Sequence, residues 1–159
     1  MYKGNKIIAI IPARKGSKRV KNKNLYPFKN KPLIYHTIVE TLKSKLIDKI
    51  IVSSNDLNII KLSKKLKVSA PFKRPNNISG DRSTASEVVN HCLDWLNDKN
   101  NENYDYIIYL QPTSPNRKVM DIDNALKIAI NKKINTLVSA TKLNFPYEWA
   151  FSLKSNQNF

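Results

Sequence analysis

The sequence predicts an α/β fold in which helices cover a mostly parallel sheet, giving three α/β/α layers. Short apolar runs rich in isoleucine and valine alternate with stretches in which apolar residues recur every three or four positions. The first pattern is typical of strands buried on both faces, and the second of amphipathic helices. Because strands that alternate with helices are joined by right-handed crossovers, we expect them to run parallel. By their number, residues 1–159 are expected to form one domain.

The first half of the chain is expected to begin with two strands joined through a helix. Residues 6–11 and 49–53 are apolar, β-branched runs that predict buried strands. Between them, apolar residues recur every four positions and predict a helix with Pro32 near its first turn. The residues with this spacing are Ile34, Ile38, Leu42 and Leu46.

The rest of the chain repeats these two patterns. The expected order is a helix capped by Asn55 or Asp56 that runs to Leu66, a helix from Thr84 or Ser86, a strand over 106–110, a helix from Asp121 and a fifth strand over 136–140. Polar segments follow the strands, at 12–24, 53–56 and 111–115. Ligands bind outside the carboxyl ends of the strands in such sheets, so we expect these segments to form the site.

Positive charge is concentrated near the N-terminus. The chain has 28 basic and 12 acidic residues, yet the first acidic residue is Glu40. Such an excess commonly indicates nucleic acid or an anionic membrane as a partner. The charge gathers around one loop, which favours a local polyanion site instead. An AT-rich genome also favours lysine codons, so part of the charge has a second explanation.

The basic loop over residues 12–24 is the main candidate site. It lacks the spacing of a Walker A loop and of a dinucleotide-binding fingerprint. Its single glycine, Gly16, suggests a positive φ or a close backbone approach. A solvated basic loop is the simpler alternative. That alternative leaves the clustered cations unexplained, because like charges repel unless an anion joins them, so we predict a phosphate-binding loop.

This loop, with the motifs that follow it, resembles the acylneuraminate cytidylyltransferases, also called CMP-sialic acid synthetases. The first motif is Ile-Ile-Pro-Ala-Arg-Lys-Gly-Ser-Lys-Arg-Val-Lys-Asn-Lys-Asn over residues 10–24. Further matching segments are Lys-Pro-Leu-Ile-Tyr-His-Thr-Ile at 31–38, Ile-Val-Ser-Ser-Asn-Asp at 51–56, Arg-Pro at 74–75, Ser-Gly-Asp at 79–81 and Leu-Gln-Pro-Thr-Ser-Pro-Asn-Arg at 110–117. The resemblance implies a Rossmann-like sheet of the nucleotide-diphospho-sugar transferase type.

The resemblance also implies a reaction and its residues. CMP would pass from CTP to the anomeric hydroxyl of a nine-carbon 2-keto sugar acid of the sialic acid type, releasing pyrophosphate. Such transfer depends on positioning and charge stabilisation. Arg14 and Lys23 match catalytic, triphosphate-binding cations. The nucleotide-binding set it implies is Arg14, Ser17, Lys18, Lys23, Asn24 and Arg74, with Arg74 near the cytosine.

The segment after the 106–110 strand is the second candidate site. Gln111, Thr113 and Ser114 offer an amide and two hydroxyls, whose directional hydrogen bonds suit a polyhydroxylated sugar. The resemblance places Gln111 on the sugar side. A polar strand end is the alternative explanation. Asp81, Thr84 and Ser86 resemble a segment near the sugar pocket, but helix capping explains them equally well.

The family uses Mg²⁺, and its protein ligands are not found in this sequence. Relatives continue well past residue 151 and hold the ion on a late aspartate pair, whereas only Glu148 is acidic after Asp123. We therefore expect the N-terminal two-thirds of an enzyme, with its domain incomplete at the C-terminal end. The complete enzyme is expected to be a homodimer. A non-catalytic nucleotide-binding fragment or partner subunit, and a nucleic-acid-binding protein, remain as alternatives.

The remaining chemistry-bearing residues favour structural roles. Cys92 is the only cysteine and lies on an apolar helix face, which excludes a disulfide within the chain and fits a reducing, cytoplasmic setting. His36 and His91 have no partner at metal-ligand spacing. Asp121 and Asp123 are better explained as acids in a first helical turn than as metal ligands. No apolar run approaches the ~20 residues that span a bilayer.

Overall fold

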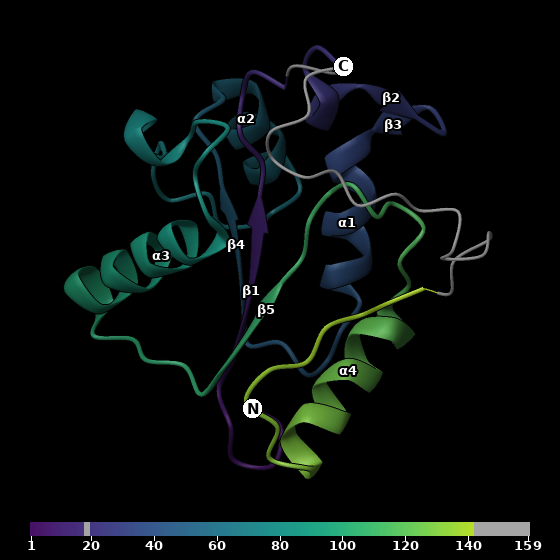
Figure 1. The fold of residues 1–159 in the computed structure, drawn as a ribbon, viewed down its shortest axis with the longest axis vertical. Helices are drawn as coiled ribbons and strands as arrows, with labels where there is room; N and C mark the ends of the chain where they lie inside the picture. Colours follow the sequence, from purple (N-terminus) through teal and green to yellow (C-terminus); the bar gives the residue numbers. More distant parts are fainter. Residues whose placement is uncertain (18–19, 142–159) are drawn as a thin grey trace, which may run out of the picture.

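The computed structural model describes residues 1–17 and 20–141, with Asn100 described by its backbone alone. Three parallel strands form the central sheet in the order β4–β1–β5 (Figure 1). They are β1 (Ile7–Pro12), β4 (Lys49–Ser53) and β5 (Tyr106–Tyr109). Ile10 lies opposite Ile51 on one side and Tyr109 on the other. The predicted parallel sheet is thus confirmed for these strands.

The helices cover both faces of the sheet, as expected for three layers. Alternate residues of β1 face opposite cores: Ile7, Ala9 and Ile11 on one side, and Ile8 and Ile10 on the other. The first core also contains buried residues of α1 (Leu33–Leu42), α2 (Leu57–Lys65) and α4 (Val119–Asn131). The second core is closed by α3 (Ala85–Asn100), through Cys92 and Leu96 (Figure 1). Cys92 and Leu96 are both fully buried, so the structural role predicted for Cys92 is confirmed.

The helix starts settle the alternatives that the sequence left open. Asp56 caps α2, since its carboxylate accepts a hydrogen bond of 2.9 Å from the Asn58 amide. Thr84, rather than Ser86, caps α3 and exchanges hydrogen bonds with Glu87 in a capping box. The expected start of α4 at Asp121 is wrong by two residues, because the Lys118 amide donates to the Asp121 carboxylate and the helix begins between them.

The four-residue spacing predicted that α1 extends to Leu46, which is wrong. The helix ends at Leu42, which is 44% exposed, and Leu46 lies beyond it. Thr41 is buried instead, with its hydroxyl donating to the Thr37 carbonyl at 2.7 Å. The reason is geometric: at 3.6 residues per turn, each step of four residues rotates the side chain by about 40°. A strict spacing of four therefore leaves the buried face within two or three steps.

The expected fifth strand over 136–140 is wrong. These residues form no strand, and Leu137 and Val138 are 39% and 80% exposed. A strand needs a neighbour that pairs with its amides and carbonyls. No described segment pairs with 136–140, and β5 pairs with β1 alone among the described strands. The β-branched residues of this segment were therefore insufficient to place it in a sheet.

The long loop predicted over 12–30 contains short regular elements. A 3₁₀ turn, η1 (Lys23–Leu25), is followed by a small antiparallel arm of β2 (Pro27–Phe28) and β3 (Lys31–Pro32). Lys29 and Asn30 adopt positive φ angles at the tip of the arm. The imidazole of His36 lies 2.7 Å from the Phe28 carbonyl, which fixes the arm on α1 and gives this histidine a structural role.

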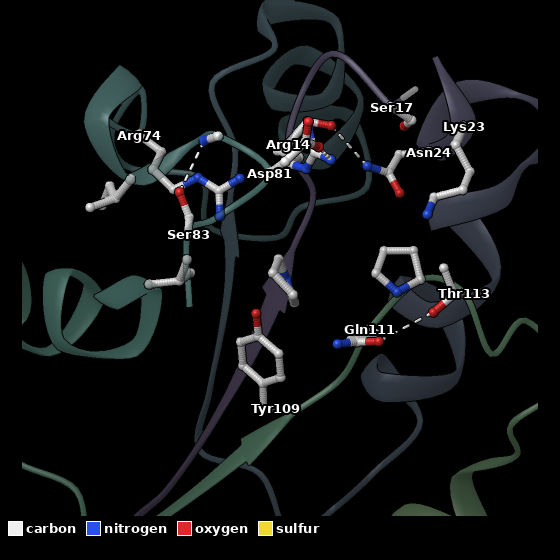
Figure 2. Close-up of a pocket in the computed structure, with 15 residues that line it drawn as sticks. Arg14, Ser17, Lys23, Asn24, Arg74, Asp81, Ser83, Tyr109, Gln111 and Thr113 are labelled. Carbon is white, nitrogen blue, oxygen red and sulfur yellow. Dashed lines mark hydrogen bonds and ion pairs between the residues drawn. The ribbon is translucent and has the colours of Figure 1, made fainter. Parts of the chain in front are cut away.

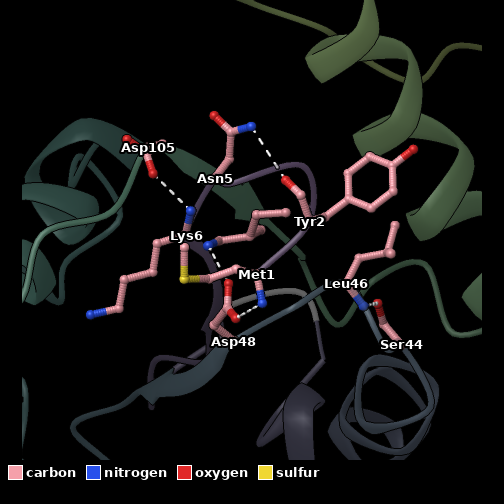
Figure 3. Close-up of polar contacts among 9 residues, drawn as sticks. Met1, Tyr2, Asn5, Lys6, Ser44, Leu46, Asp48 and Asp105 are labelled. Atoms are coloured by element: carbon pink, nitrogen blue, oxygen red, sulfur yellow. Dashed lines mark hydrogen bonds and ion pairs between the residues drawn. The ribbon is translucent and has the colours of Figure 1, made fainter.

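Two carboxylates bind the amino end of β1. Asp48 accepts a hydrogen bond of 2.7 Å from the Ile7 amide, and Asp105 accepts one of the same length from the Lys6 amide (Figure 3). Asp48 also pairs with the N-terminal ammonium group. These acids thus lie at the opposite end of the sheet from the loops that follow the strands. That separation leaves the carboxyl end of the sheet with a surplus of cations.

Candidate functional site

A cavity of about 210 Å³ opens at the carboxyl ends of the strands. Its walls come from three parts of the chain: the loop after β1, the segment between α2 and α3, and the end of β5 with the residues that follow it (Figure 2). Of the residues singled out in the sequence, the cavity is lined by Arg14, Ser17, Lys23, Asn24, Arg74, Asp81, Gln111 and Thr113. The fold therefore brings together segments that lie up to a hundred positions apart.

Hydrogen bonds hold the loop after β1 in place. The Ala13 amide donates to the Ser53 carbonyl at 2.9 Å, so the loop starts beside the end of β4. The Lys15 amide donates to the Asn55 side chain at 2.7 Å. Gly16 adopts φ +80°, the positive φ that the sequence suggested. The loop is thus a shaped structure and not a freely solvated run of charges.

Asn24 is a brace for this loop as well as a lining residue. It is 7% exposed, and its amide nitrogen donates to the Arg14 carbonyl at 3.0 Å. Lys23 precedes it in the 3₁₀ turn and directs its ammonium group toward the cavity (Figure 2). Lys23 forms no ion pair with any residue that the structure describes.

Arg14 reaches across the cavity. One guanidinium nitrogen donates to the Gly16 carbonyl at 3.0 Å, and another pairs with the Asp81 carboxylate. Asp81 is the one carboxylate among the described residues that line the cavity. Arg14 and Asp81 keep 31% and 39% of their side-chain surface exposed, so the pair is accessible to a competing anion.

Arg74 is a buried cation beside this pair. It is 3% exposed, its amide donates to the Ser54 carbonyl at 2.8 Å, and its Nε donates to the Ser79 hydroxyl at 3.1 Å. No described carboxylate forms an ion pair with it. Burial lowers the pKa of Arg74, and the nearby charge of Arg14 adds to this. Because an arginine stays charged at neutral pH, this corner holds an uncompensated positive charge.

The residues after β5 form the opposite wall. The Thr113 hydroxyl lies 3.4 Å from the Gln111 side-chain oxygen (Figure 2). Both guanidinium ends of Arg117 approach the Gln111 carbonyl at 3.4 Å, which supports the turn. Ser114 is exposed and does not line the cavity. Lys18 lies outside the described residues, so its predicted role stays a prediction.

Two polar residues that line the cavity were not predicted from the sequence. Tyr109 rises from the end of β5 into the cavity, and Ser83 accepts a hydrogen bond from the Gly80 amide at its rim (Figure 2). Tyr109 precedes Gln111 by two positions. Since side chains two apart in a strand share a face, that spacing was the available signal for Tyr109.

The described residues do not make a magnesium site. Mg²⁺ is usually held by one or two carboxylates together with substrate phosphates. The cavity offers Asp81 alone, and Arg14 already engages it. No group of three His, Cys, Asp or Glu side chains suited to a metal occurs among the described residues. Asp121 accepts a hydrogen bond from the Lys118 amide, and Asp123 accepts one of 2.5 Å from the Ser44 hydroxyl. Both carboxylates therefore have structural partners.

The sequence profile of the family described as cytidylyltransferase matches residues 8–155. The chain belongs to this family. The match covers every strand and helix described above, apart from Ile7 at the start of β1, and all the residues that line the cavity. The resemblance drawn from the motifs is therefore confirmed at the level of the family.

Curated cytidylyltransferases match most of the chain. It is 35% identical over 151 residues to a pseudaminic acid cytidylyltransferase of Campylobacter jejuni, covering 95% of this chain and 65% of the relative. It is 34% identical to a CMP-N,N'-diacetyllegionaminic acid synthase of Legionella pneumophila, covering 96% and 65%. It is 36% identical to an N-acylneuraminate cytidylyltransferase of Escherichia coli, covering 89% and 32%. The chain thus spans less than two thirds of the length of these relatives.

The fold of the cytidylyltransferases is also found by structural comparison. A CMP:2-keto-3-deoxy-manno-octonic acid synthetase, solved with CTP, superposes with a TM-score of 0.65 at 21% identity, covering 81% of this chain and 49% of the other. At that identity the likeness shows the fold alone. Separately, no helix in the described part of the chain has the length and apolar character needed to cross a membrane.

Proposed function

We propose that this cytidylyltransferase chain binds CTP and transfers its CMP group to the anomeric hydroxyl of a nine-carbon 2-keto sugar acid. The single observation that supports it is the charge of the cavity. Arg14, Lys23 and Arg74 line it, and Asp81 is the one described carboxylate to offset them. A nucleoside triphosphate carries about four negative charges, so its phosphates would supply the anion that this wall lacks.

The order of the strands suggests how the substrates lie. Arg74 lies beside the end of β4, because its amide bonds the Ser54 carbonyl, while Arg14 follows β1 and Gln111 follows β5, in a sheet ordered β4–β1–β5. In this proposal the base lies at Arg74, the phosphates lie over the loop with Arg14, and the sugar acid lies at Gln111 and Thr113. Ser17, Lys18 and Asn24 belong to the phosphate loop. The two substrates would then meet above the centre of the sheet.

Arg14 and Lys23 carry the catalytic proposal. The sugar hydroxyl loses its proton to solvent, and its oxygen forms a new bond to the α-phosphorus. The bond from that phosphorus to the bridging oxygen breaks, and pyrophosphate leaves with the electron pair. Negative charge grows on the phosphoryl oxygens as this occurs. A preorganised cation at that position typically contributes about 10²–10³ in rate. The family typically uses Mg²⁺. No step is assigned to this ion, because the described residues do not form a magnesium site.

The sugar is proposed at the level of a nonulosonic acid, meaning a nine-carbon keto-sugar acid. The relatives named above are enzymes of pseudaminic, N,N'-diacetyllegionaminic and N-acylneuraminic acids. These substrates share the acidic keto-sugar frame and differ in their substituents. An amide and a hydroxyl at Gln111 and Thr113 suit hydrogen bonding to such substituents without selecting one of them. We place the reaction in the cytoplasm, where the unpaired thiol of Cys92 stays reduced.

A calorimetric titration with CTP, followed by a product assay with each of the three acids, tests the proposal. Saturable CTP binding together with CMP-sugar formation is expected. Saturable binding without product from any acid would instead support the non-catalytic nucleotide-binding alternative. Absence of CTP binding would overturn both.

The surplus of lysine makes nucleic-acid binding an alternative that should be tested directly. Neutralising many phosphates along a duplex makes affinity fall steeply with salt. A cavity that encloses one triphosphate has far fewer contacts, so we expect a shallow salt dependence for CTP and a preference for CTP over duplex DNA. A steep slope with DNA preferred would favour the nucleic-acid-binding class.

A further inference from the structure

The peptide group between Arg14 and Lys15 is held at both ends by asparagine side chains. Its carbonyl oxygen accepts a hydrogen bond of 3.0 Å from the Asn24 amide (Figure 2). Its N–H donates to the side-chain oxygen of Asn55 at 2.7 Å. Asn24 belongs to η1, and Asn55 lies between β4 and α2, so the two contacts come from different parts of the chain. Because a peptide group has one donor and one acceptor, bonding both fixes the orientation of its plane.

Asn55 continues the ladder between β1 and β4 with its side chain. At the end of this ladder, the Ala13 amide donates to the Ser53 carbonyl at 2.9 Å. Bonds in a parallel ladder are evenly spaced, so the next one would join the Lys15 amide to the backbone carbonyl of Asn55. The backbone turns into a helix there instead, because Asp56 caps α2. The side-chain oxygen of Asn55 thus supplies the bond that the ladder would otherwise lose.

The fixed peptide group lies directly before the glycine of the loop. Gly16 adopts φ +80°, and beyond its chain neighbours no atom lies within 4 Å of the position that a Cβ would occupy. Neither a side chain nor close packing therefore restricts the backbone at this residue. The Arg14 guanidinium donates to the Gly16 carbonyl at 3.0 Å, so the place of this charge depends on the backbone here. Fixing the preceding peptide group consequently helps to fix the guanidinium.

We infer that Asn55 is a positioning residue for the phosphate loop. Together with Asn24, it holds the Arg14–Lys15 peptide group and so keeps the Arg14 guanidinium at the cavity before a nucleotide binds. Asn55 is not among the residues that line the cavity, so it acts through the loop and touches no substrate. A preorganised cation needs no rearrangement when the phosphates arrive, which is how it strengthens binding. The inference rests on the proposed function and adds to it a residue from outside the basic loop.

The test is Asn55→Ala, with CTP and inorganic triphosphate as separate calorimetric probes. Loss of one neutral hydrogen bond should weaken the binding of both probes about three- to ten-fold. The two losses should be alike, because the effect passes through the loop that holds the phosphates. Asn58→Ala is the matched control, since Asn58 is an exposed asparagine on α2 whose backbone amide, not its side chain, bonds Asp56. It should leave the binding of both probes unchanged.

Amide hydrogen exchange without nucleotide tests the contact itself. The Lys15 N–H should be protected in the unaltered protein and should exchange faster in Asn55→Ala. Asn55→Asp keeps an oxygen that can accept the same bond, so the protection should remain. This variant should also recover the CTP affinity to within about two-fold of the unaltered protein at about 0.5 M salt, where its added charge is largely screened. A residue needed only for general stability would not give this pattern.

Three results would overturn the inference. They are unchanged CTP affinity in Asn55→Ala, a loss that inorganic triphosphate does not share, and a loss that Asn55→Asp does not recover. If circular dichroism shows that Asn55→Ala is misfolded, the exchange rate in the unaltered protein decides, because an unprotected Lys15 amide refutes the contact. If the unaltered protein binds neither probe, the proposed function fails and this inference fails with it. Affinity that a folded Asn55→Ala leaves intact refutes this inference alone.

Discussion

Arg14 and Asp81 form an ion pair that joins the loop after β1 to the segment before α3, across the cavity. The two residues are 67 positions apart in the chain. In the proposed function, the phosphates of CTP compete with Asp81 for the same guanidinium. The carboxylate then acts as a counter-ion that is exchanged when the nucleotide binds.

This exchange predicts that Asp81→Asn binds CTP more tightly. Removing the competing charge leaves Arg14 to the phosphates, and partly exposed ion pairs are worth about 0.2–1 kcal/mol, so the gain in affinity should be up to about five-fold. Titration calorimetry at low salt measures it. Asp94→Asn, on the exposed side of α3, is the control. Weaker binding in Asp81→Asn would mean that Asp81 positions Arg14 instead of competing for it.

Arg14→Ala and, separately, Lys23→Ala should each weaken CTP binding by about ten-fold or more, because charge-assisted bonds typically contribute about 1.5–3 kcal/mol. Both side chains line the cavity, and Lys23 has no described ion-pair partner to lose. Lys127→Ala, an exposed change on α4, controls for net charge. Unchanged affinity in both variants would refute the phosphate-loop assignment.

Arg74→Met should stabilise the protein while it weakens CTP binding. Replacing a buried, uncompensated charge by an apolar chain of similar length removes a desolvation cost, which often amounts to about 1–4 kcal/mol. Part of this gain is offset by the lost hydrogen bond to Ser79. We therefore expect Tm to rise by a few degrees. CTP affinity should fall at least about ten-fold, which corresponds to the loss of one hydrogen bond from a charged group.

Differential scanning calorimetry and CTP titration measure the two effects of Arg74→Met. Arg82→Met, an exposed change nearby, should alter neither quantity. A fall in Tm would show that the Ser79 contact outweighs the burial of the charge. Retained CTP affinity would refute the proposal that the base of CTP lies at Arg74.

Gln111→Ala should impair turnover of the sugar acid more than CTP binding. Gln111 lies after β5, on the wall opposite Arg74, and its amide contacts Thr113 (Figure 2). Losing neutral hydrogen bonds to the sugar should raise its KM about three- to ten-fold. Steady-state kinetics, with the sugar acid and CTP varied in turn, measure the KM for each substrate separately. If the CTP constant changes and the sugar constant does not, the assignment of sides is reversed.

The sequence by itself determined the parallel sheet and the location of the candidate site along the chain. β-branched runs predicted β1 and β4 because burial on both faces needs continuous apolar residues, and that requirement is local. The concentration of cations in residues 14–23, with Glu40 as the first acid, likewise predicted an anion site. Both signals depend on neighbouring residues alone, so a single sequence contains them.

Only the tertiary structure decided which distant residues meet. The strand order β4–β1–β5 places Arg74 and Tyr109 beside Arg14, and no spacing in the chain encodes that order. It also showed that 136–140 pairs with no described strand, since β-propensity describes a fit to a neighbour and cannot supply one. The pairing of Arg14 with Asp81 and the burial of Arg74 arise from packing between segments. Packing between distant segments is set by the whole fold, and local pattern does not determine it.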